Sequence, residues 1–402
     1  MSKNHNSEYA SLMFDVSKSL ASVGLAALAG LLCIASAASA LGGEGAVYVQ
    51  TNTAPTNYVV VFDRSHDGTL TLVGRVPTGG VGKPAGNPPL GIPYLDTAGS
   101  VTLSDNGKVL FVVNAGDNTV SSFRVRSHGL EFADREATFG SRPVSSTSHD
   151  HLLYVLNSET TSASISGYRV NDSGIMRPIP GSVRPTINPT GGIPAQIQFD
   201  ANGTFLAVSE RQTFVGHGVI DIFPVDSRGV AGSPVAHPSS DDGPFGISFT
   251  HNDLMIVSNE HFALPPPTSP STVSSYDLDH DGTVTPIDTE SAHAAGACWN
   301  AITNDEKFVF ITSPFTANIN SFRIGRHGDL IPVNETSVVA TAAGVTLDIS
   351  LSRDSKFLYV LVSAGPFASS TIYAYALNKD GTITLIGATA PFEGSASGTA
   401  AK

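Results

Sequence analysis

The sequence predicts an all-β fold, a seven-bladed β-propeller with four-stranded antiparallel blades, on three observations. A polar residue followed by glycine and, within two positions, an aliphatic residue recurs seven times along the chain. The stretches between these turns are rich in Val, Ile, Phe and Tyr, and they alternate or run apolar as strands do. No internal segment has a convincing helical periodicity. A repeat of roughly fifty residues with one hairpin in each indicates a ring of blades.

The seven turns set the number of blades. Glycine adopts a positive φ without steric cost, so a polar residue and glycine between two apolar runs predict a tight hairpin. The glycines of these turns are Gly68, Gly129, Gly174, Gly229, Gly282, Gly328 and Gly381. Blocks between the turns share one order: an apolar strand, a polar turn, a strongly apolar strand, a small loop and an alternating strand. The strand after the glycine completes four strands in each blade.

The first blade lacks an obvious strand before its first segment, Val47 to Gln50. A propeller must close into a ring, so a later part of the chain has to supply the missing strand. We predict that a segment near Ala390 to Glu393 does so.

Residues 1–40 are predicted to be a signal peptide, and residues 41–402 to form the propeller as a single domain. The run from Leu20 to Ala40 is uncharged and rich in Ala and Leu, and it ends in the A-x-A pattern Ala38-Ser39-Ala40 of a cleavage site. An uncleaved membrane anchor is the alternative, because this run is just long enough to span a bilayer. We expect a secreted, extracellular protein without stable membrane insertion.

Composition restricts the partners. The net charge is −13 and there is no basic patch, which argues against nucleic acid. After cleavage only Cys298 remains, so an intrachain disulfide is not possible. The expected partner is a small-molecule lactone or another extracellular ligand, bound by a monomer.

Two patterns resemble metal sites. Asp277, Asp279, Asp281 and Asp288 have the spacing of a calcium loop, with Asp in place of the usual final Glu. Asp281 also belongs to one of the seven hairpin turns, so a structural turn is favoured and calcium is the alternative. The pair His149 and His151 occupies the polar turn of blade three. We therefore predict no metal and no cofactor.

The first two blades carry a family resemblance. The stretches GAVYVQTN, NYVVVFDRSHDGTLTLVGRVPTGG and GSVTLSDNGKVLFVVNAGDNTVSSFRV resemble the seven-bladed lactonase family. This family includes propeller-type 6-phosphogluconolactonases and fungal carboxymuconate cyclases, and the chain is most similar to its secreted, carboxymuconate cyclase-like members. The resemblance implies opening or closing of a lactone ring at a metal-free site in the central channel, with a Glu, a His and two Arg.

Only one of these four family positions is matched here. Ala195 and Gln196 stand where the blade-four pattern has Arg and His, and Glu210 stands where it has Glu. In blade five Glu260 replaces an Arg, and in blade three the expected His falls near Arg142. The resemblance therefore transfers the fold more completely than the mechanism.

Glu210 and Glu260 are the predicted catalytic residues, at the ends of inner strands by the channel mouth. Two carboxylates in a concave site raise one another's pKa and can act as an acid/base pair, with Glu210 as the general acid/base. The alternative is that each carboxylate accepts hydrogen bonds from strand-end amides. Arg211 follows Glu210 directly, so in a continuing strand it points to the opposite face.

The predicted substrate-binding residues are Arg142, Arg211, His261 and Trp299. The first three offer cations to an anionic substrate. Trp299 is predicted to form the floor of a ligand pocket, with packing between blades as the alternative. The sequence is compatible with two functions. One is a secreted lactonase or cyclase, and the other is a non-catalytic extracellular propeller that binds a ligand, a glycan or a protein.

Overall fold

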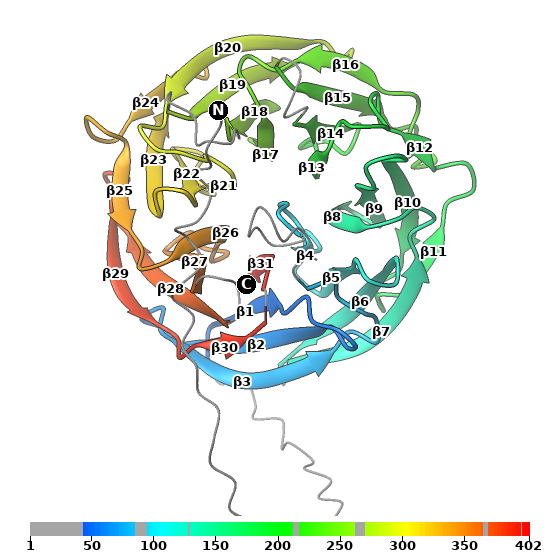
Figure 1. Ribbon diagram of the computed structural model, residues 1–402, viewed down its shortest axis with the longest axis horizontal. Helices are drawn as coiled ribbons and strands as arrows, with labels where there is room; N and C mark the ends of the chain where they lie inside the picture. Colours follow the sequence, from blue (N-terminus) through cyan, green and yellow to red (C-terminus); the bar gives the residue numbers. More distant parts are fainter. Residues whose placement is uncertain are drawn as a thin grey trace, which may run out of the picture. The chain divides into compact units, whose positions relative to one another are not determined.

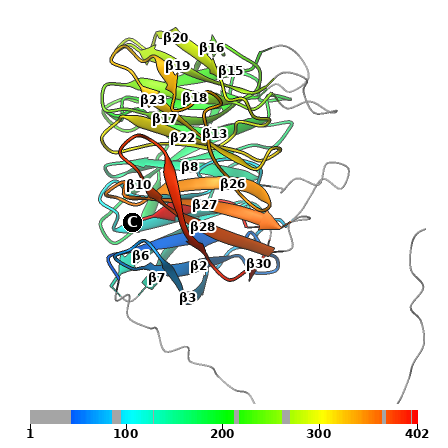
Figure 2. The same ribbon diagram turned by 90° about the vertical axis from the view of Figure 1, so that its left-hand side faces the viewer.

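Seven antiparallel sheets surround one axis, which confirms the seven-bladed propeller (Figure 1). The computed structural model describes residues 43–84, 95–127, 129–211, 217–261, 270–364, 369–394 and 396–402. The predicted signal peptide, residues 1–40, lies outside the described residues. Figure 2 shows the same ring from its side.

Each blade has the same strand order from the axis outward. The innermost strands, from blade one to blade seven, are β31 (Thr399–Ala401), β4 (Val101–Leu103), β8 (Pro143–His149), β13 (Pro194–Phe199), β17 (Pro244–Phe249), β21 (Asn300–Ile302) and β26 (Val345–Leu351). The second strands are β1 (Gly45–Gln50), β5 (Val109–Asn114), β9 (Leu152–Asn157), β14 (Phe205–Glu210), β18 (Leu254–Asn259), β22 (Phe308–Ser313) and β27 (Phe357–Ala364). The third strands are β2 (Tyr58–Arg64), β6 (Thr119–Arg126), β10 (Ser164–Val170), β15 (Val219–Pro224), β19 (Thr272–Leu278), β23 (Asn318–Ile324) and β28 (Ser369–Leu377).

The outer strands complete the blades. They are β3 (Leu70–Pro77), β7 (Gly129–Ala137), β11 (Met176–Pro178), β16 (Val235–Pro238), β20 (Val284–Ser291), β24 (Leu330–Pro332) and β29 (Ile383–Ala388). Three further short strands pair with the third strands of blades three, six and seven: β12 (Arg184–Pro185), β25 (Val338–Thr341) and β30 (Phe392–Glu393). Within the part of the chain that is described, no helix has the length and apolar character to cross a bilayer.

Six of the seven predicted glycines lie in the turn between a third strand and an outer strand, and Gly129 is the first residue of the outer strand β7. Their φ angles run from 71° to 110°, the left-handed region that glycine enters without penalty. In several of these turns an aspartate fixes the loop; Asp281 Oδ1, for example, accepts the backbone N–H of Thr283 at 2.9 Å. Asp288 Oδ2 instead accepts the Leu330 N–H at 2.8 Å. These contacts agree with the turn interpretation of the calcium-like pattern.

The ring closes at a different segment from the one predicted. Phe392 and Glu393 form β30, which pairs with β28 in blade seven, so the prediction near Ala390 to Glu393 was wrong. Blade one is completed by β31, in which Ala400 pairs with Tyr48 of β1. The sequence did not predict β31 because this strand is only three residues long, Thr-Ala-Ala, and has no apolar run typical of a strand.

A buried carboxyl group holds this closing strand. Asp348 lies in β26, and its Oδ2 accepts the Thr399 N–H at 2.9 Å while its Oδ1 accepts the Ile349 N–H at 2.8 Å. Burial raises the pKa of Asp348 to about 7. Asp348 therefore ties blade seven to the strand that completes blade one.

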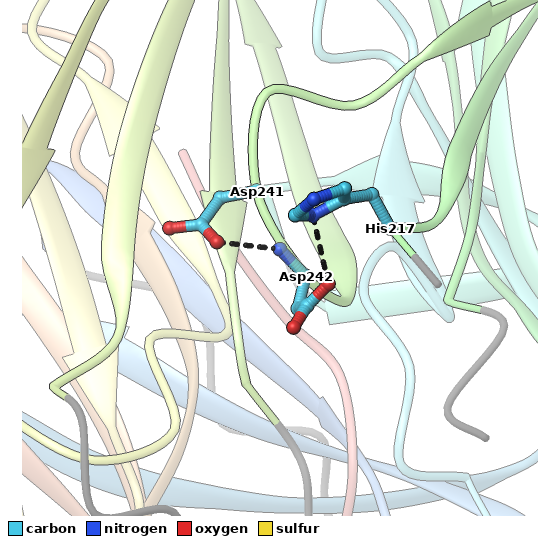
Figure 3. A group of neighbouring side chains, drawn as sticks. All are labelled: His217, Asp241 and Asp242. Carbon is cyan, nitrogen blue, oxygen red and sulfur yellow. Dashed lines mark hydrogen bonds and ion pairs between the residues drawn. The ribbon is translucent and has the colours of Figure 1, made fainter. Parts of the chain in front are cut away.

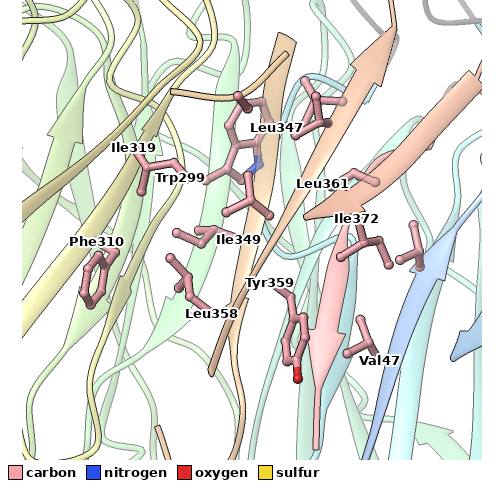
Figure 4. Close-up of a cluster of buried hydrophobic side chains, with 14 of the residues drawn as sticks. Val47, Trp299, Phe310, Ile319, Leu347, Ile349, Leu358, Tyr359, Leu361 and Ile372 are labelled. Carbon is pink, nitrogen blue, oxygen red and sulfur yellow. The ribbon is translucent and has the colours of Figure 1, made fainter. Parts of the chain in front are cut away.

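The core lies between neighbouring blades. Every residue of the second strands β5, β14 and β22 is buried, because both faces of each sheet pack against the adjacent sheets. One cluster joins blades six, seven and one, and Figure 4 shows it from Trp299 through Leu358 to Val47. This packing makes the blade ends a rigid frame for side chains at the axis.

The strand order fixes where functional residues gather. Innermost and second strands are antiparallel, so the start of one lies beside the end of the other, as Pro194 lies beside Glu210. Since every blade repeats this order, the ends of all second strands meet the starts of all innermost strands at one end of the ring. We call this the site end.

Candidate functional site

A buried ion pair forms the centre of the site end. Arg211 follows β14 of blade four and Glu260 follows β18 of blade five. Arg211 Nη1 lies 3.4 Å from Glu260 Oε1, and the two side chains are 6% and 2% exposed. The guanidinium also lies over the Phe245 ring, 5.1 Å from its centroid. Sequence reasoning proposed both charged residues separately, and the structure brings them together.

A third charge reaches this pair from blade two's entry segment. Arg211 Nη1 donates to Asp96 Oδ2 at 3.0 Å, and Nη2 donates to the Asp96 carbonyl at 2.9 Å. Arg211 Nε donates to the Ile193 carbonyl at 3.2 Å. Every nitrogen of the guanidinium therefore has a partner, and two of the partners are carboxylates.

Asp96 belongs to a short segment, residues 95–98, which we call the strap. Thr97 Oγ1 donates to the Val144 carbonyl of blade three at 3.0 Å, and the Ala98 N–H donates to the Ala195 carbonyl of blade four at 3.2 Å. From the approach to blade six, Trp299 Nε1 donates to the Thr97 carbonyl at 3.0 Å. The strap thus lies across the site end and contacts three blades.

Burial and charge set the protonation of Glu260. Burial raises its pKa to about 7, with Arg211 lowering it and Asp96 raising it. A carboxyl group with a pKa near neutrality can both donate and accept a proton under physiological conditions. For Arg211 burial opposes the charged form, but Glu260 and Asp96 outweigh it and raise the pKa, so the guanidinium stays charged.

Cys298 completes the cluster. Its Sγ lies 3.8 Å from Glu260 Oε2, towards which the thiol donates. Burial, followed by the negative charges of Glu260 and Asp96, raises the pKa of Cys298 well above its ordinary value. The sulfur is therefore a protonated thiol rather than a nucleophilic thiolate.

Glu210 has a different environment from Glu260. Its carboxylate accepts the Asn188 backbone N–H at 3.2 Å and the Asn188 side-chain amide at 2.6 Å. Asp221 of β15 lies beside it, and burial together with the Glu210 charge raises the pKa of Asp221 to about 8. Arg211, the next residue, lies beyond the end of β14 and contacts Asp96 and Glu260 instead. The structure thus places the two predicted catalytic carboxylates in separate hydrogen-bond networks.

The other predicted binding residues are distributed around the same end. Trp299 is buried and packs edge-on against Phe245, with ring centroids 5.0 Å apart. It therefore packs between blades and also contacts the strap. His261, with a 10% exposed side chain, has its Nε2 2.9 Å from Asp241 Oδ2. Arg142 directly precedes β8, and its backbone N–H donates to Asn118 Oδ1 at 2.8 Å.

One cluster of metal-ligand residue types lies near His261. Potential ligand atoms of His217, Asp241 and Asp242 are within 4.8 Å of one another, the one such trio in the described ranges (Figure 3). His217 Nδ1 pairs with Asp242 Oδ1 at 2.8 Å, and Asp241 Oδ1 accepts the Asp242 N–H at 2.9 Å. Burial raises the pKa of Asp241, but hydrogen bonds led by that from Thr272 lower it overall. His217 and Asp242 are exposed and satisfy each other, so we assign no ion to this trio.

Sequence reasoning missed Asp96 and Asp221. Asp96 lies 115 residues from Arg211 in the sequence, and no periodicity connects them. Asp221 sits inside the strand Val219–Pro224, where strand alternation predicts which face it takes but not which neighbour it meets. Only the circular arrangement of the blades brings these groups together.

Comparisons with known proteins show which family part of the chain resembles. Residues 55–184 match the family model described as Lactonase, 7-bladed beta-propeller. No curated protein matches the chain.

Among solved structures, the periplasmic gluconolactonase of Pseudomonas aeruginosa is 16% identical with a TM-score of 0.64, covering 88% of this chain and 98% of its own. A "putative 6-phosphogluconolactonase" of Bacteroides fragilis is 16% identical with a TM-score of 0.61, covering 90% and 99%. A hypothetical selenium-binding protein of Sulfolobus tokodaii is 10% identical with a TM-score of 0.61, covering 90% and 93%. At these identities the likeness shows the fold alone. In the sequence of residues 55–184 and in the fold of all seven blades, the chain resembles the seven-bladed β-propeller lactonase family.

Proposed function

We propose that the protein is a lactonase-like hydrolase that opens or closes a lactone ring at the site end of its channel. The observation that supports this proposal best is the pair of Glu260 and Arg211. A carboxyl group with a pKa of about 7 stands beside a permanently charged guanidinium, and both are removed from water. Lactone hydrolysis needs these two elements, a group that transfers protons and a cation that stabilises developing negative charge.

The proposed reaction uses Glu260 twice. As the carboxylate, it accepts a proton from the water whose oxygen attacks the lactone carbonyl carbon. The carbonyl oxygen becomes negatively charged, and the Arg211 guanidinium stabilises it. As the carboxylic acid, Glu260 then returns the proton to the ring oxygen as its bond to the carbonyl carbon breaks. The product is an open-chain hydroxy acid, and ring closure is the same sequence in reverse.

We assign the acid/base role to Glu260 in preference to Glu210. The predicted role of Glu210 is less well supported, because Asn188 and Asp221 already surround its carboxylate. Asn188 belongs to the segment that leads into blade four, so Glu210 also serves to hold that segment. Glu260, by contrast, shares its environment with a cation.

The remaining expectations belong to the same proposal. The apolar run that ends at Ala40 supports secretion, and the net charge of −13 supports a small-molecule rather than a nucleic-acid partner. We propose a secreted monomer that acts without a cofactor on a small lactone. Carboxymuconate cyclase-like chemistry is one form of this reaction.

One observation favours the second candidate, a non-catalytic extracellular propeller. All guanidinium nitrogens of Arg211 have partners inside the protein, and the strap covers the pair. A binding protein with a structural charge cluster would have the same contacts. Activity separates the two candidates.

The deciding experiment is hydrolysis of a panel of neutral and anionic lactones by the purified protein. Glu260→Gln is expected to lower kcat at least about a hundredfold, the scale of a lost general acid/base. Glu210→Gln should have a smaller effect, and Glu335→Gln, at an exposed position, is the matched control.

Loss of activity in Glu210→Gln with a normal Glu260→Gln would reverse the assignment. The absence of turnover on every lactone by folded wild-type protein would reject the enzyme and leave the binding propeller.

A further inference from the structure

We propose that the protein carries N-linked oligosaccharides at Asn171, Asn202 and Asn334. Each of these asparagines begins a triplet Asn-x-Ser or Asn-x-Thr, the acceptor pattern for this modification, and in none of the three is the middle residue proline. The inference rests on the proposed secretion, here through a eukaryotic secretory pathway, which is where the donor of the oligosaccharide is found. It does not depend on the lactonase reaction.

The modification forms one bond and breaks one. The Asn side-chain nitrogen Nδ2 bonds to the anomeric carbon of an oligosaccharide that a lipid pyrophosphate carries, and the bond from that carbon to the pyrophosphate oxygen breaks. Nδ2 gives up one of its two protons, which balances the charge left on the pyrophosphate. The other proton stays, so a glycosylated Asn still donates one hydrogen bond.

The fold places all three acceptors on the surface and outside the strands. Asn171 lies in the turn between β10 and β11 of blade three, Asn202 in the turn between β13 and β14 of blade four, and Asn334 between β24 and β25 of blade six. All three residues are exposed. An oligosaccharide at such a turn extends into solvent and displaces no strand.

The hydrogen bonds of these turns leave an amide proton of each asparagine for the sugar to replace. Among the described contacts, Asn171 uses its Oδ1, which accepts two backbone N–H groups of its own turn at 3.0 and 2.9 Å. Asn202 Nδ2 donates to Asp253 Oδ2 at 2.6 Å, and Asn334 Nδ2 donates to the Val338 carbonyl at 2.7 Å. Each of these two bonds needs one proton, and Nδ2 has two.

The three positions leave the site end free. Turns from innermost to second strands, and from third to outer strands, lie at the opposite end of the ring. Asn171 and Asn202 therefore lie at that opposite end in adjacent blades, and Asn334 lies at the outer edge of its blade. At the site end, the triplet Asn188-Pro189-Thr190 has the proline that excludes acceptance, and Asn188 Nδ2 donates to Glu210.

Blade two supplies a matched control. Asn106 occupies the same turn in blade two that Asn202 occupies in blade four, and it is also exposed. Lys108 stands where blade four has Thr204, so the acceptor pattern is missing. Asn106 should therefore stay unmodified in the wild type, and Lys108→Thr should add an oligosaccharide at this turn.

The test is expression of the full chain in a eukaryotic host, followed by peptide mass spectrometry before and after treatment with peptide-N-glycosidase. This enzyme converts each glycosylated Asn to Asp, and running it in heavy-oxygen water distinguishes the conversion from spontaneous deamidation. A mass shift is expected at Asn171, Asn202 and Asn334 and none at Asn106 or Asn188. Ser173→Ala keeps Asn171 itself but removes its acceptor pattern, so this variant should lose the shift at Asn171 alone.

The absence of a shift at all three asparagines would overturn the inference, whether the turns or the predicted signal peptide is the cause. A shift at Asn171 that survives Ser173→Ala would overturn it as well, and so would a Lys108→Thr variant that gains no oligosaccharide. The wild type decides alone should a variant fail to fold. Lactone hydrolysis is measured on the same protein after the oligosaccharides are removed, so either proposal can fail while the other holds.

Discussion

Cys298 illustrates how burial controls the protonation of single residues at the site end. Its thiol is enclosed and directed at Glu260, so both solvent exclusion and nearby negative charge oppose the thiolate. A lone cysteine beside Glu260, the carboxyl group proposed to transfer protons, would otherwise suggest a nucleophile. Its environment instead keeps Cys298 a neutral thiol beside Glu260.

The expected consequence is low reactivity. In the folded protein at pH 8, an aromatic disulfide reagent should modify Cys298 at least about a hundredfold more slowly than in urea, because only the thiolate reacts and only opening exposes it. Mass spectrometry of the Cys298 peptide over time measures both rates. Equal rates in the two conditions would contradict the enclosed, protonated thiol.

At the scale of single elements, the three-residue strand β31 has a large role for its length. It supplies the innermost strand of blade one, and its pairing with β1 is supplemented by Asp348 of blade seven. The glycine turns could be predicted, because their positive φ is a local requirement that the sequence shows directly. The closing strand could not, because Thr-Ala-Ala has no signal and gains its structure from two neighbouring blades.

Asp348→Ala is expected to lower the free energy of unfolding by about 1–3 kcal/mol at pH 6, since the buried Thr399 and Ile349 amides lose their acceptor. Urea denaturation measures the change. Asp172→Ala removes an exposed carboxylate from a turn without a positive φ and serves as the control. If the two variants are equally stable, Asp348 does not hold the closing strand.

For the whole molecule, three buried carboxyl groups set the response of stability to pH. The pKa values of Glu260 and Asp348 are raised to about 7 and that of Asp221 to about 8, in each case chiefly by burial. The folded state therefore binds more protons than the unfolded state between pH 4 and pH 8. Their stabilising contribution is complete below the unfolded pKa and is lost as pH rises through the folded pKa.

The free energy of unfolding should thus fall between pH 5.5 and pH 8.5, by an amount on the order of a few kcal/mol. Turn aspartates with lowered pKa values, such as Asp281 and Asp380, act only at more acidic pH and leave this window unaffected. Urea midpoints at the two pH values test the sign. A midpoint that rises with pH would show that these carboxyl groups are charged in the folded state.

The site was harder to predict from sequence than the ring. The sequence identified Glu260, Arg211 and Trp299 as separate candidates at blade ends, and the repeat explains why they gather there. It did not indicate the contact of Asp96 with Arg211, which depends on a connecting segment crossing the axis. Local sequence patterns are enough to predict the strands of each blade. The contacts between connecting segments depend on how the blades close into a ring, which no local pattern shows.

Because β31 is the last strand in the sequence, its pairing with β1 can form only at the end of synthesis. Its partner β1 leaves the ribosome roughly 350 residues earlier, a delay of about 20–70 s at ordinary translation rates. During this delay the edge of β1 that faces the axis has no strand paired with it, although blades two to seven have already been synthesised. An unpaired strand edge can pair with another chain, so β1 is open to such pairing until β31 has been synthesised.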